Sequence, residues 1–262
     1  VLEKLLTVEV GDRLRDLDIQ DSMEALRNFY RENAYYAAQV TLKNADYVYR
    51  SEGTGAGVVF VIDEGRPVSI DRIVIEGNEK TKDKVIRREI SLVPGGPLNT
   101  VELRKSVGRL WDLRYFSRVD PSVRDTADPS RKDVVLRVEE GSTGNIRFSA
   151  GINSNLGLLG DVTITKQNFD LFDWPKSFRD LTESRAFTGG GQFLRLSVSP
   201  GTTYSTFRVT YREPWLFDHR LGGEVDFYKS LLFRPGYDVD RLGFRMEVDK
   251  RFTFKGDELD DR

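Results

Sequence analysis

The sequence predicts an α+β fold, made of a repeated β-α-α-β-β unit, followed by a long run of antiparallel strands. Three observations predict it. Residues 58–65 and 134–141 are closely similar at an offset of 76 residues. Of 29 aromatic residues, 10 lie in residues 1–141 and 19 in residues 142–262. This second part alternates apolar and polar residues with a period of two, which is typical of strands with two different faces.

The second copy of the repeat, residues 66–141, contains every expected element. The expected elements are a strand over 68–76, helices over 82–90 and 100–111, and a hairpin of strands over 119–123 and 134–138. The alternation of the first strand shifts by one residue near Arg72. Thr81 is expected to N-cap the first helix and Thr100 the second.

The first copy, residues 1–65, has the same order without the initial strand. A strand is expected over residues 37–43, and the glycine-rich run 53–57 is expected in a hairpin loop. Both copies end in an acidic pair, Asp63-Glu64 and Glu139-Glu140. Because the pairs recur at the same place, they favour a structural corner over catalytic carboxylates.

The strands expected in residues 142–262 are long. Segments 203–213, 221–232 and 239–254 run about 11 to 16 residues, whereas strands of soluble proteins average ~5–6 residues and membrane-crossing strands need ~9–11. Alternation alone fits both a soluble sandwich and a transmembrane β-barrel, and strand length favours the barrel.

Composition excludes several functions. The net charge of -2, from 40 basic and 42 acidic residues, gives no electrostatic reason to expect nucleic-acid binding. There is no cysteine and a single histidine, which leaves no thiolate chemistry and little basis for a histidine triad or metal site. We therefore expect a protein that is not an enzyme and has no cofactor and no metal.

Four segments resemble the Omp85 superfamily of outer-membrane proteins, in its BamA-like branch. Residues 75–89 are similar to the start of a POTRA domain, and residues 144–153 to the first barrel strand; residues 167–169 and 212–218 resemble the ends of the second and fourth strands. The resemblance implies a POTRA domain at 1–65, truncated at its N-terminus, a complete one at 66–141, and the start of an outer-membrane β-barrel at 142–262. It also implies that the chain is a fragment, with about six of an expected 16 barrel strands.

The resemblance implies an outer-membrane protein assembly and insertion factor, with its POTRA domains in the periplasm of a Gram-negative-type bacterium. Its implied partners are unfolded outer-membrane proteins, outer-membrane lipid, and accessory periplasmic or lipoprotein subunits. The alternatives are a two-partner-secretion pore of the same superfamily, a passive porin with periplasmic modules, and a soluble sandwich protein.

By the family pattern, the second strand of each POTRA unit is an exposed edge to which a client segment can add as a further strand. The alternative is a simply solvated edge, blunted by its basic residues. The residues predicted for client binding are Ala37, Ala38, Gln39, Val40, Thr41, Arg118, Val119, Ser122 and Val123.

The first barrel strand is the candidate for a lateral seam, because its glycine and small polar residues weaken pairing. The alternative is that these small residues relieve crowding on the barrel wall. The residues predicted for the seam are Asn145, Ile146, Arg147, Phe148, Ser149, Ala150, Gly151 and Ile152.

Aromatic residues beside two expected turns are candidates for the membrane interface. Those of the insertion 170–188 could equally belong to a turn that packs on the last POTRA unit. The predicted interface residues are Phe169, Phe172, Trp174, Trp215 and Phe217.

Overall fold

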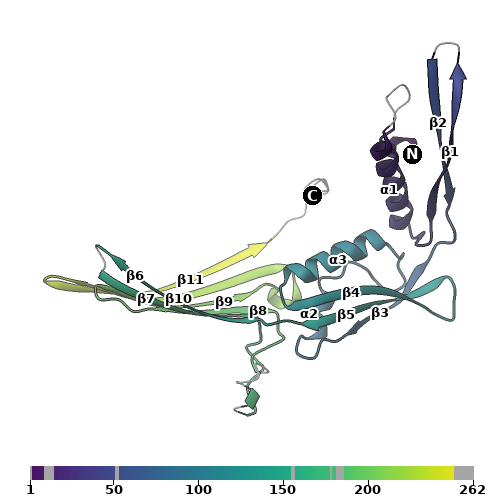
Figure 1. The fold of residues 1–262 in the computed structure, drawn as a ribbon. Helices are drawn as coiled ribbons and strands as arrows, with labels where there is room; N and C mark the ends of the chain where they lie inside the picture. The colour runs from purple at the N-terminus through teal and green to yellow at the C-terminus, as the bar shows by residue number, and fades with distance from the viewer. Residues whose placement is uncertain are drawn as a thin grey trace. The chain divides into compact units, whose positions relative to one another are not determined.

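The computed structural model describes residues 2–8, 15–50, 53–154, 157–177, 179–180 and 186–250, with side chains described outside 44–57 (Figure 1). It divides into two compact units. The first is Val1–Gly77, Arg87–Leu113 and Arg118–Glu139, and the second is Asn78–Ile86, Arg114–Ser117 and Glu140–Arg262. The repeat therefore falls mainly in the first unit, and the run of strands in the second.

The repeat elements form a two-stranded and a three-stranded sheet with their helices. β1 pairs with β2, and the other three strands have the order β3-β5-β4. The bounds are η1 (Leu2–Leu5), α1 (Asp16–Glu32), β1 (Gln39–Arg50), β2 (Gly53–Asp63), β3 (Ser69–Glu76), α2 (Asp83–Arg87), α3 (Thr100–Asp112), β4 (Phe116–Asp125) and β5 (Arg131–Glu140).

The internal repeat is visible in matching hydrogen bonds. Ser22 of α1 and Ser106 of α3 are both fully buried. The Ser22 hydroxyl donates to the Asp18 carbonyl and accepts from the Thr7 amide, at 2.7 and 3.0 Å. Ser106 donates to the Glu102 carbonyl and accepts from the Ser91 amide, at 2.8 and 3.2 Å. The same serine thus fastens the preceding segment to the main helix of each copy.

In the three-stranded sheet, β3 runs parallel to β5, and α3 lies along the sheet (Figure 1). α3 is amphipathic and turns Leu103 and Leu110 into the core. The central strand β5 supplies four buried apolar residues, Val134, Val135, Leu136 and Val138. The fully buried core residues of this unit include Ile70, Leu98, Leu110, Val134 and Leu136.

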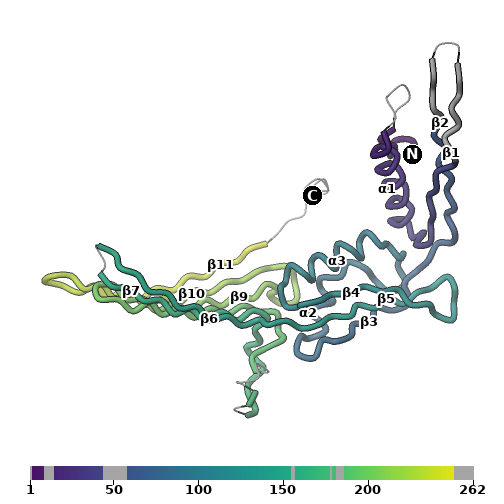
Figure 2. Tube along the Cα trace, viewed as in Figure 1, coloured from purple at the N-terminus to yellow at the C-terminus, as the bar shows by residue number. Residues whose placement is uncertain are grey.

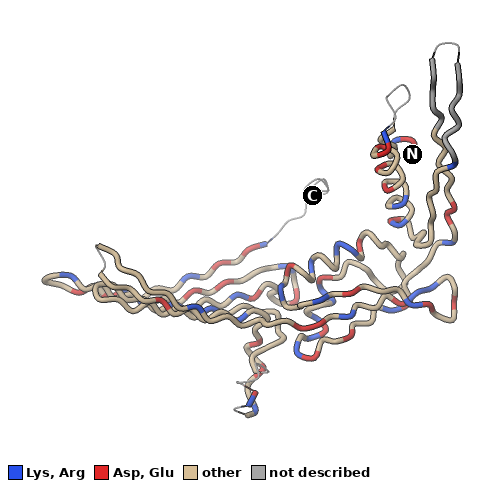
Figure 3. The backbone as a smooth tube through the Cα atoms, viewed as in Figure 1, with Lys and Arg blue, Asp and Glu red and all other residues tan. Residues whose placement is uncertain are grey.

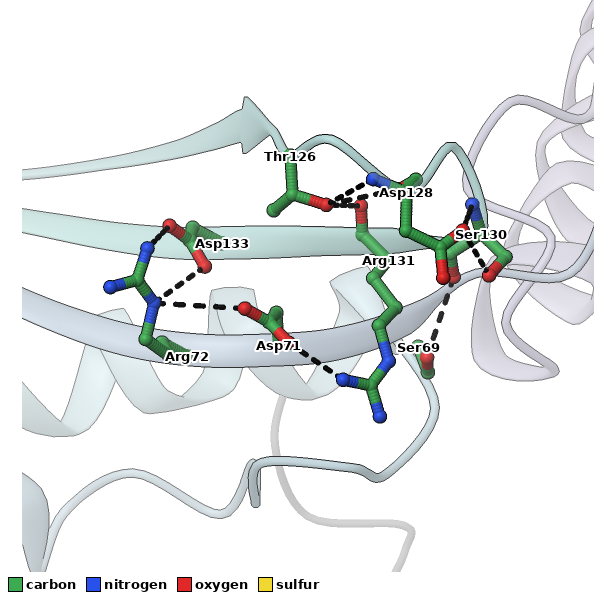
Figure 4. Close-up of polar contacts among 8 residues, drawn as sticks. All are labelled: Ser69, Asp71, Arg72, Thr126, Asp128, Ser130, Arg131 and Asp133. Carbon is green, nitrogen blue, oxygen red and sulfur yellow. Dashed lines mark hydrogen bonds and ion pairs between the residues drawn. The ribbon is translucent and has the colours of Figure 1, made fainter.

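The expected slip in β3 is confirmed as a register shift between Ile70 and Ile73. Its two intervening side chains are held by ion pairs with β5 (Figure 4). Arg72 donates to Asp133, which is only 3% exposed, at 2.7 Å, and Arg131 donates to Asp71 at 2.9 Å. The hydrogen bond to the Asp133 carboxylate raises the pKa of Arg72. At this bulge, Asp71 and Arg72 are out of register with β5 and form ion pairs with its side chains.

The turn between β4 and β5 is organised by its own polar side chains (Figure 4). The Asp128 carboxylate accepts from the hydroxyl and the amide of Ser130, at 2.7 and 2.9 Å, and these bonds lower the pKa of Asp128. The Thr126 hydroxyl donates to the Arg131 carbonyl at 2.9 Å.

Three local expectations are wrong. α2 is a five-residue helix and not the expected nine-residue one. Asn99, and not Thr100, caps α3, because its side chain accepts from the Glu102 amide at 2.9 Å. Residues 53–57 form part of β2 and not a loop; β1 and β2 make one long hairpin with a register shift between Lys43 and Asp46. Glycine is rare enough in strands that the run indicated a loop.

The second unit contains a six-stranded antiparallel sheet in the order β11-β10-β9-β8-β7-β6 (Figure 2). Each strand pairs with the next one in the chain. The bounds are β6 (Gly144–Asn153), β7 (Gly157–Phe169), β8 (Gln192–Ser199), β9 (Tyr204–Glu213), η2 (Leu216–Asp218), β10 (Leu221–Arg234) and β11 (Tyr237–Lys250). In the part of the chain that is described, no helix is long and apolar enough to cross a membrane.

Candidate functional site

The first candidate surface is the free edge of the three-stranded sheet. β4 is an outermost strand, as predicted, with Val119 buried and Arg118 and Ser122 exposed. Arg118 pairs with Asp120 at 2.7 Å. Pro121 lies in the middle of β4 and has no N–H to donate, which suits an edge and reduces what the edge can offer to an added strand.

Two ion pairs converge on Glu76 of β3, one from β4 and one from β5. Arg124 and Arg137 donate to the two oxygens of Glu76, at 3.5 and 3.0 Å. These bonds, that from Arg137 above all, lower the pKa of Glu76. Figure 3 shows charges of both signs spread over β3, β4 and β5. Such a hydrophilic edge resists uncontrolled pairing with other chains.

The prediction for the corresponding segment of the first copy is partly wrong. Ala37 and Ala38 lie in the turn before β1, where the Ala38 amide donates to the Tyr35 carbonyl at 3.1 Å. Val40 is buried, and its carbonyl accepts from Arg27 of α1 at 2.9 Å. Helix α1 therefore covers part of the edge. Ala37, Gln39 and Thr41 are exposed, and of these only Gln39 and Thr41 lie in β1.

The second candidate surface is β6, an outermost strand of the six-stranded sheet. All ten of its residues pair with β7, from Gly144 with Lys166 to Asn153 with Gly157. All ten are also exposed, including Phe148 at 74% and Ile152 at 87%. The predicted seam strand thus has its expected bounds, with one strand as its partner in the described structure.

The register gives the six-stranded sheet one apolar face and one polar face. One row that crosses all six strands is entirely apolar: Ile146, Ile164, Leu196, Val209, Phe227 and Phe244. The next row is mostly polar: Arg147, Thr163, Ser197, Arg208, Tyr228 and Gly243.

The apolar face is exposed. Ile146, Phe244 and Met246 have 59%, 63% and 68% of their surface accessible. In a sandwich this face would be buried against a second sheet, whereas in a barrel wall it faces lipid. The exposure therefore favours the barrel over the sandwich.

The polar face is internally bonded. Asp226 is buried and accepts from the Thr210 hydroxyl at 2.5 Å, while Arg245 pairs with it at 3.3 Å. The Arg208 guanidinium lies 5.8 Å from the ring centroid of Tyr228. Such satisfied polar rows are typical of the inner wall of a membrane barrel.

A buried polar joint connects the end of β7 with the segment before α2, within the second unit. Asn168, 1% exposed, donates to the Thr81 hydroxyl at 2.8 Å and accepts from the Gly191 amide at 2.9 Å. The Lys82 amide donates to the Gly189 carbonyl at 3.0 Å. Tyr115 donates to the Gly191 carbonyl at 3.1 Å.

The three glycines at 189–191 are part of this joint. Gly189 has a φ of +105°, and a Cβ there would lie 2.0 Å from the Lys80 carbonyl oxygen. A Cβ on Gly190 would lie 2.8 Å from the Phe169 carbonyl oxygen. No sequence pattern predicted this joint: a glycine run is typical of close backbone contact but does not indicate which segment makes the contact.

The acidic corners are structural, as expected. Glu140 accepts from the Lys80 and Thr81 amides, at 2.9 and 2.6 Å. Glu64 accepts from the Tyr30 hydroxyl at 2.8 Å, and this bond raises the pKa of Tyr30. Within the described residues, no cluster of three His, Asp or Glu side chains could hold a metal ion.

The predicted interface aromatics differ in exposure. Phe169 is buried and stacks on Phe187, with ring centroids 5.8 Å apart. The prediction that its ring lies at the surface is therefore wrong. Phe172 and Trp174 are 79% and 68% exposed, and Trp174 also contacts Phe187.

The other two predicted interface aromatics lie between β9 and β10. Phe217 of η2 is 85% exposed, and Trp215 is half-buried with Arg220 over its ring at 5.6 Å. Within the insertion 170–188, residues 178 and 181–185 lie outside the described structure.

The fold and its amphipathic sheet define a class of protein: repeated α+β modules that lead into the wall of an outer-membrane β-barrel. The model of the POTRA family, described as "Surface antigen variable number repeat", matches residues 1–65 and 68–141. The chain belongs to this family, in the BamA-like branch of the Omp85 superfamily. It is accordingly part of an outer-membrane protein with periplasmic POTRA domains.

Two curated relatives illustrate the similarity. A putative outer membrane protein assembly factor of Treponema pallidum is 27% identical over 90% of this chain and 27% of its own length. The outer membrane protein assembly factor BamA of Nitratidesulfovibrio vulgaris is 31% identical over 92% of this chain and 29% of its own length. The chain thus spans less than a third of either relative.

Two solved structures share the fold. BamA from Haemophilus ducreyi lacking POTRA domains 1–3 matches with a TM-score of 0.73 and 24% identity, over 88% of this chain and 40% of that one. CdiB from Acinetobacter baumannii matches with a TM-score of 0.50 and 16% identity, over 94% of this chain and 44% of that one.

Proposed function

We propose that this chain acts in the assembly of outer-membrane proteins, with β6 as the strand that an incoming client strand pairs with. The observation that carries the proposal is the state of β6. It pairs with β7 along its whole length, and its small residues Gly144, Ser149 and Gly151 give a strand on its other side little side-chain anchoring. The backbone of that other side can bond any extended segment, because the hydrogen bonds of a β-ladder do not depend on side-chain identity.

β4 is the proposed earlier contact for unfolded clients. Its edge is accessible, although Pro121 and the ion pairs of Arg118 and Arg124 limit how long an added strand can be. Gln39 and Thr41 form a smaller second candidate. We propose that the functional division follows residues 1–65 and 66–141 as client-receiving POTRA domains and 142–262 as barrel wall. Accessory periplasmic or lipoprotein subunits and outer-membrane lipid are further proposed partners.

Site-specific photo-cross-linking tests the role of β6 in the full-length protein. A photoreactive residue replaces Ser149 of β6 or, as a matched control, Ser197 of the interior strand β8. Both serines lie on the polar face. We expect an outer-membrane client arrested during assembly to cross-link from Ser149 and not from Ser197. Equal cross-linking from both positions would contradict the proposal.

Hydrogen exchange gives a second test without a client. Amides of residues 145–153 are expected to exchange faster than those of 205–212, which lie in β9 between two partner strands. Equal protection of the two segments would contradict the hypothesis that β6 forms a weak seam.

Depletion separates the assembly role from the two-partner-secretion alternative. Loss of an assembly factor lowers the amount of many unrelated folded barrels in the outer membrane. Loss of a secretion pore lowers only the export of its soluble partner, and loss of a passive porin only ion conductance. The names of the curated relatives support the first outcome, and the likeness to CdiB concerns the fold alone.

A further inference from the structure

A cavity of about 580 Å³ opens beside the start of β6 and the end of β7, where the chain arrives from β5. All of its lining residues belong to the second unit. Its walls combine two lysines, Lys80 and Lys166, with two isoleucines, Ile146 and Ile164. The volume lies within the ~300–1,000 Å³ typical of small-molecule sites.

Lys166 lies on the apolar face of the sheet. It pairs across the ladder with Gly144 on one side and Leu194 on the other, two residues along from the pair of Ile146 and Ile164. Gly144 has no side chain, and a Cβ there would be 4.0 Å from the Lys166 Cδ. The half-buried lysine stem therefore lies over an open position, at the end of a row of residues suited to lipid.

Lys80 adds a second positive charge. It lines the same cavity as Lys166. In the part of the chain that the structure describes, neither lysine forms an ion pair with a carboxylate. Glu140 also lines the cavity, but its carboxylate accepts from the backbone amides of Lys80 and Thr81. The cavity lining thus contains two positive charges against the single negative charge of Glu140, and this positive excess favours an anion.

We propose that this cavity binds the phosphate headgroup of an anionic phospholipid, with Lys80 and Lys166 on the phosphate and the acyl chains along Ile146 and Ile164. The apolar wall continues into the exposed face of β6 and β7, so a ligand with both an anionic head and a long apolar tail is complementary to it. Free phosphate shares the charge but would leave the apolar wall bare. The inference rests on the proposed membrane function of this sheet and adds a lipid class and a site to it.

Native mass spectrometry of the full-length protein tests the proposal. Detergent-solubilised protein is titrated with phosphatidylglycerol or with zwitterionic phosphatidylcholine. We expect tighter binding of phosphatidylglycerol, weakened about fivefold by Lys166→Gln and further by the added Lys80→Gln, since each basic residue near an anionic membrane surface contributes about this factor. Lys166→Arg is expected to retain binding.

Lys229→Gln is the matched control. Lys229 is another lysine of the same sheet, and it pairs with Asp240 at 3.2 Å. This variant is expected to bind phosphatidylglycerol normally. Equal binding by wild type, K166Q and the double variant, or equal affinity for the two lipids, would overturn the proposal. Displacement of the lipid by millimolar inorganic phosphate alone would show a phosphate site and also overturn it.

Assembly of a client barrel by the same variants is measured separately. Phosphatidylglycerol binding that needs both lysines, in a protein without assembly activity, refutes the proposed function and retains the lipid site. Normal client assembly by variants whose lipid binding does not depend on the two lysines refutes the lipid site and retains the proposed function.

Discussion

Replacing Asn168 tests whether the buried joint stabilises the second unit. Its side chain makes two buried hydrogen bonds, to the Thr81 hydroxyl and from the Gly191 amide, and its φ is +51°. Asn168→Ala leaves both partners unsatisfied, at about 1–3 kcal/mol each, and puts alanine in the left-handed region, at about 1–2 kcal/mol. We expect a total loss of roughly 3–8 kcal/mol.

Asn168→Gly separates the two contributions. Glycine also removes the hydrogen bonds but adopts positive φ freely, so it should be about 1 kcal/mol more stable than the alanine variant. Guanidinium unfolding of the full-length protein in detergent micelles measures the free energies, and hydrogen exchange at Gly191 reports the local opening. Asn145→Ala, at an exposed position of β6, is the control and should change stability by less than about 0.5 kcal/mol.

A loss below about 1 kcal/mol for Asn168→Ala would refute the reasoning, as would a glycine variant less stable than the alanine variant. A double-mutant cycle with Thr81→Val adds a direct test. Because the two side chains are bonded to each other, their losses should not add, and the coupling should be at least about 0.5 kcal/mol.

Two further predictions concern the three-stranded sheet. Gly77→Ala should destabilise the protein by well over 2 kcal/mol, because its φ is +91° and a Cβ there would lie 2.0 Å from a carbonyl oxygen of β5. Gly95→Ala should lose only about 1–2 kcal/mol, because its φ is +80° but the space around it is open. Urea unfolding compares the two variants, and equal losses of stability would contradict the clash at Gly77. The folded-state pKa of Glu76 lies below its ordinary value of 4.5, so its stabilising effect is present above pH 4.5 and lost as pH falls through the folded value. Arg137→Met should move this pKa back toward 4.5 in a carboxyl NMR titration, and an unchanged midpoint would show that Arg137 is not the cause.

The sheet architecture could be predicted because its signals are local. Period-two alternation fixes which residues share a face, so the row from Ile146 to Phe244 follows from the sequence once the strands are paired in chain order. The slip near Arg72 was visible for the same reason, since one misplaced residue breaks the alternation of β3.

The buried joint could not be predicted, because its partners are far apart in the sequence. Asn168 and Thr81 are separated by 87 positions, and a threonine before a helix is ordinarily a cap. Phe169 was misplaced for a similar reason: an aromatic residue at a strand end is typical of an interface, but its partner Phe187 comes from the far side of the insertion. In both cases tertiary contacts override the local pattern.

The two candidate edges differ in how they meet their surroundings, and this difference supports the proposed roles. β4 is edged with paired charges and interrupted by Pro121, so it can stay unpaired in water. β6 has a single charged residue, Arg147, and exposes large apolar side chains, which in water would promote aggregation. In lipid, its unpaired backbone groups would each cost several kcal/mol. An unpaired β6 edge would thus be unfavourable in both solvents, so the proposed role requires a second strand beside β6. In that role an incoming client strand supplies the same backbone hydrogen bonds.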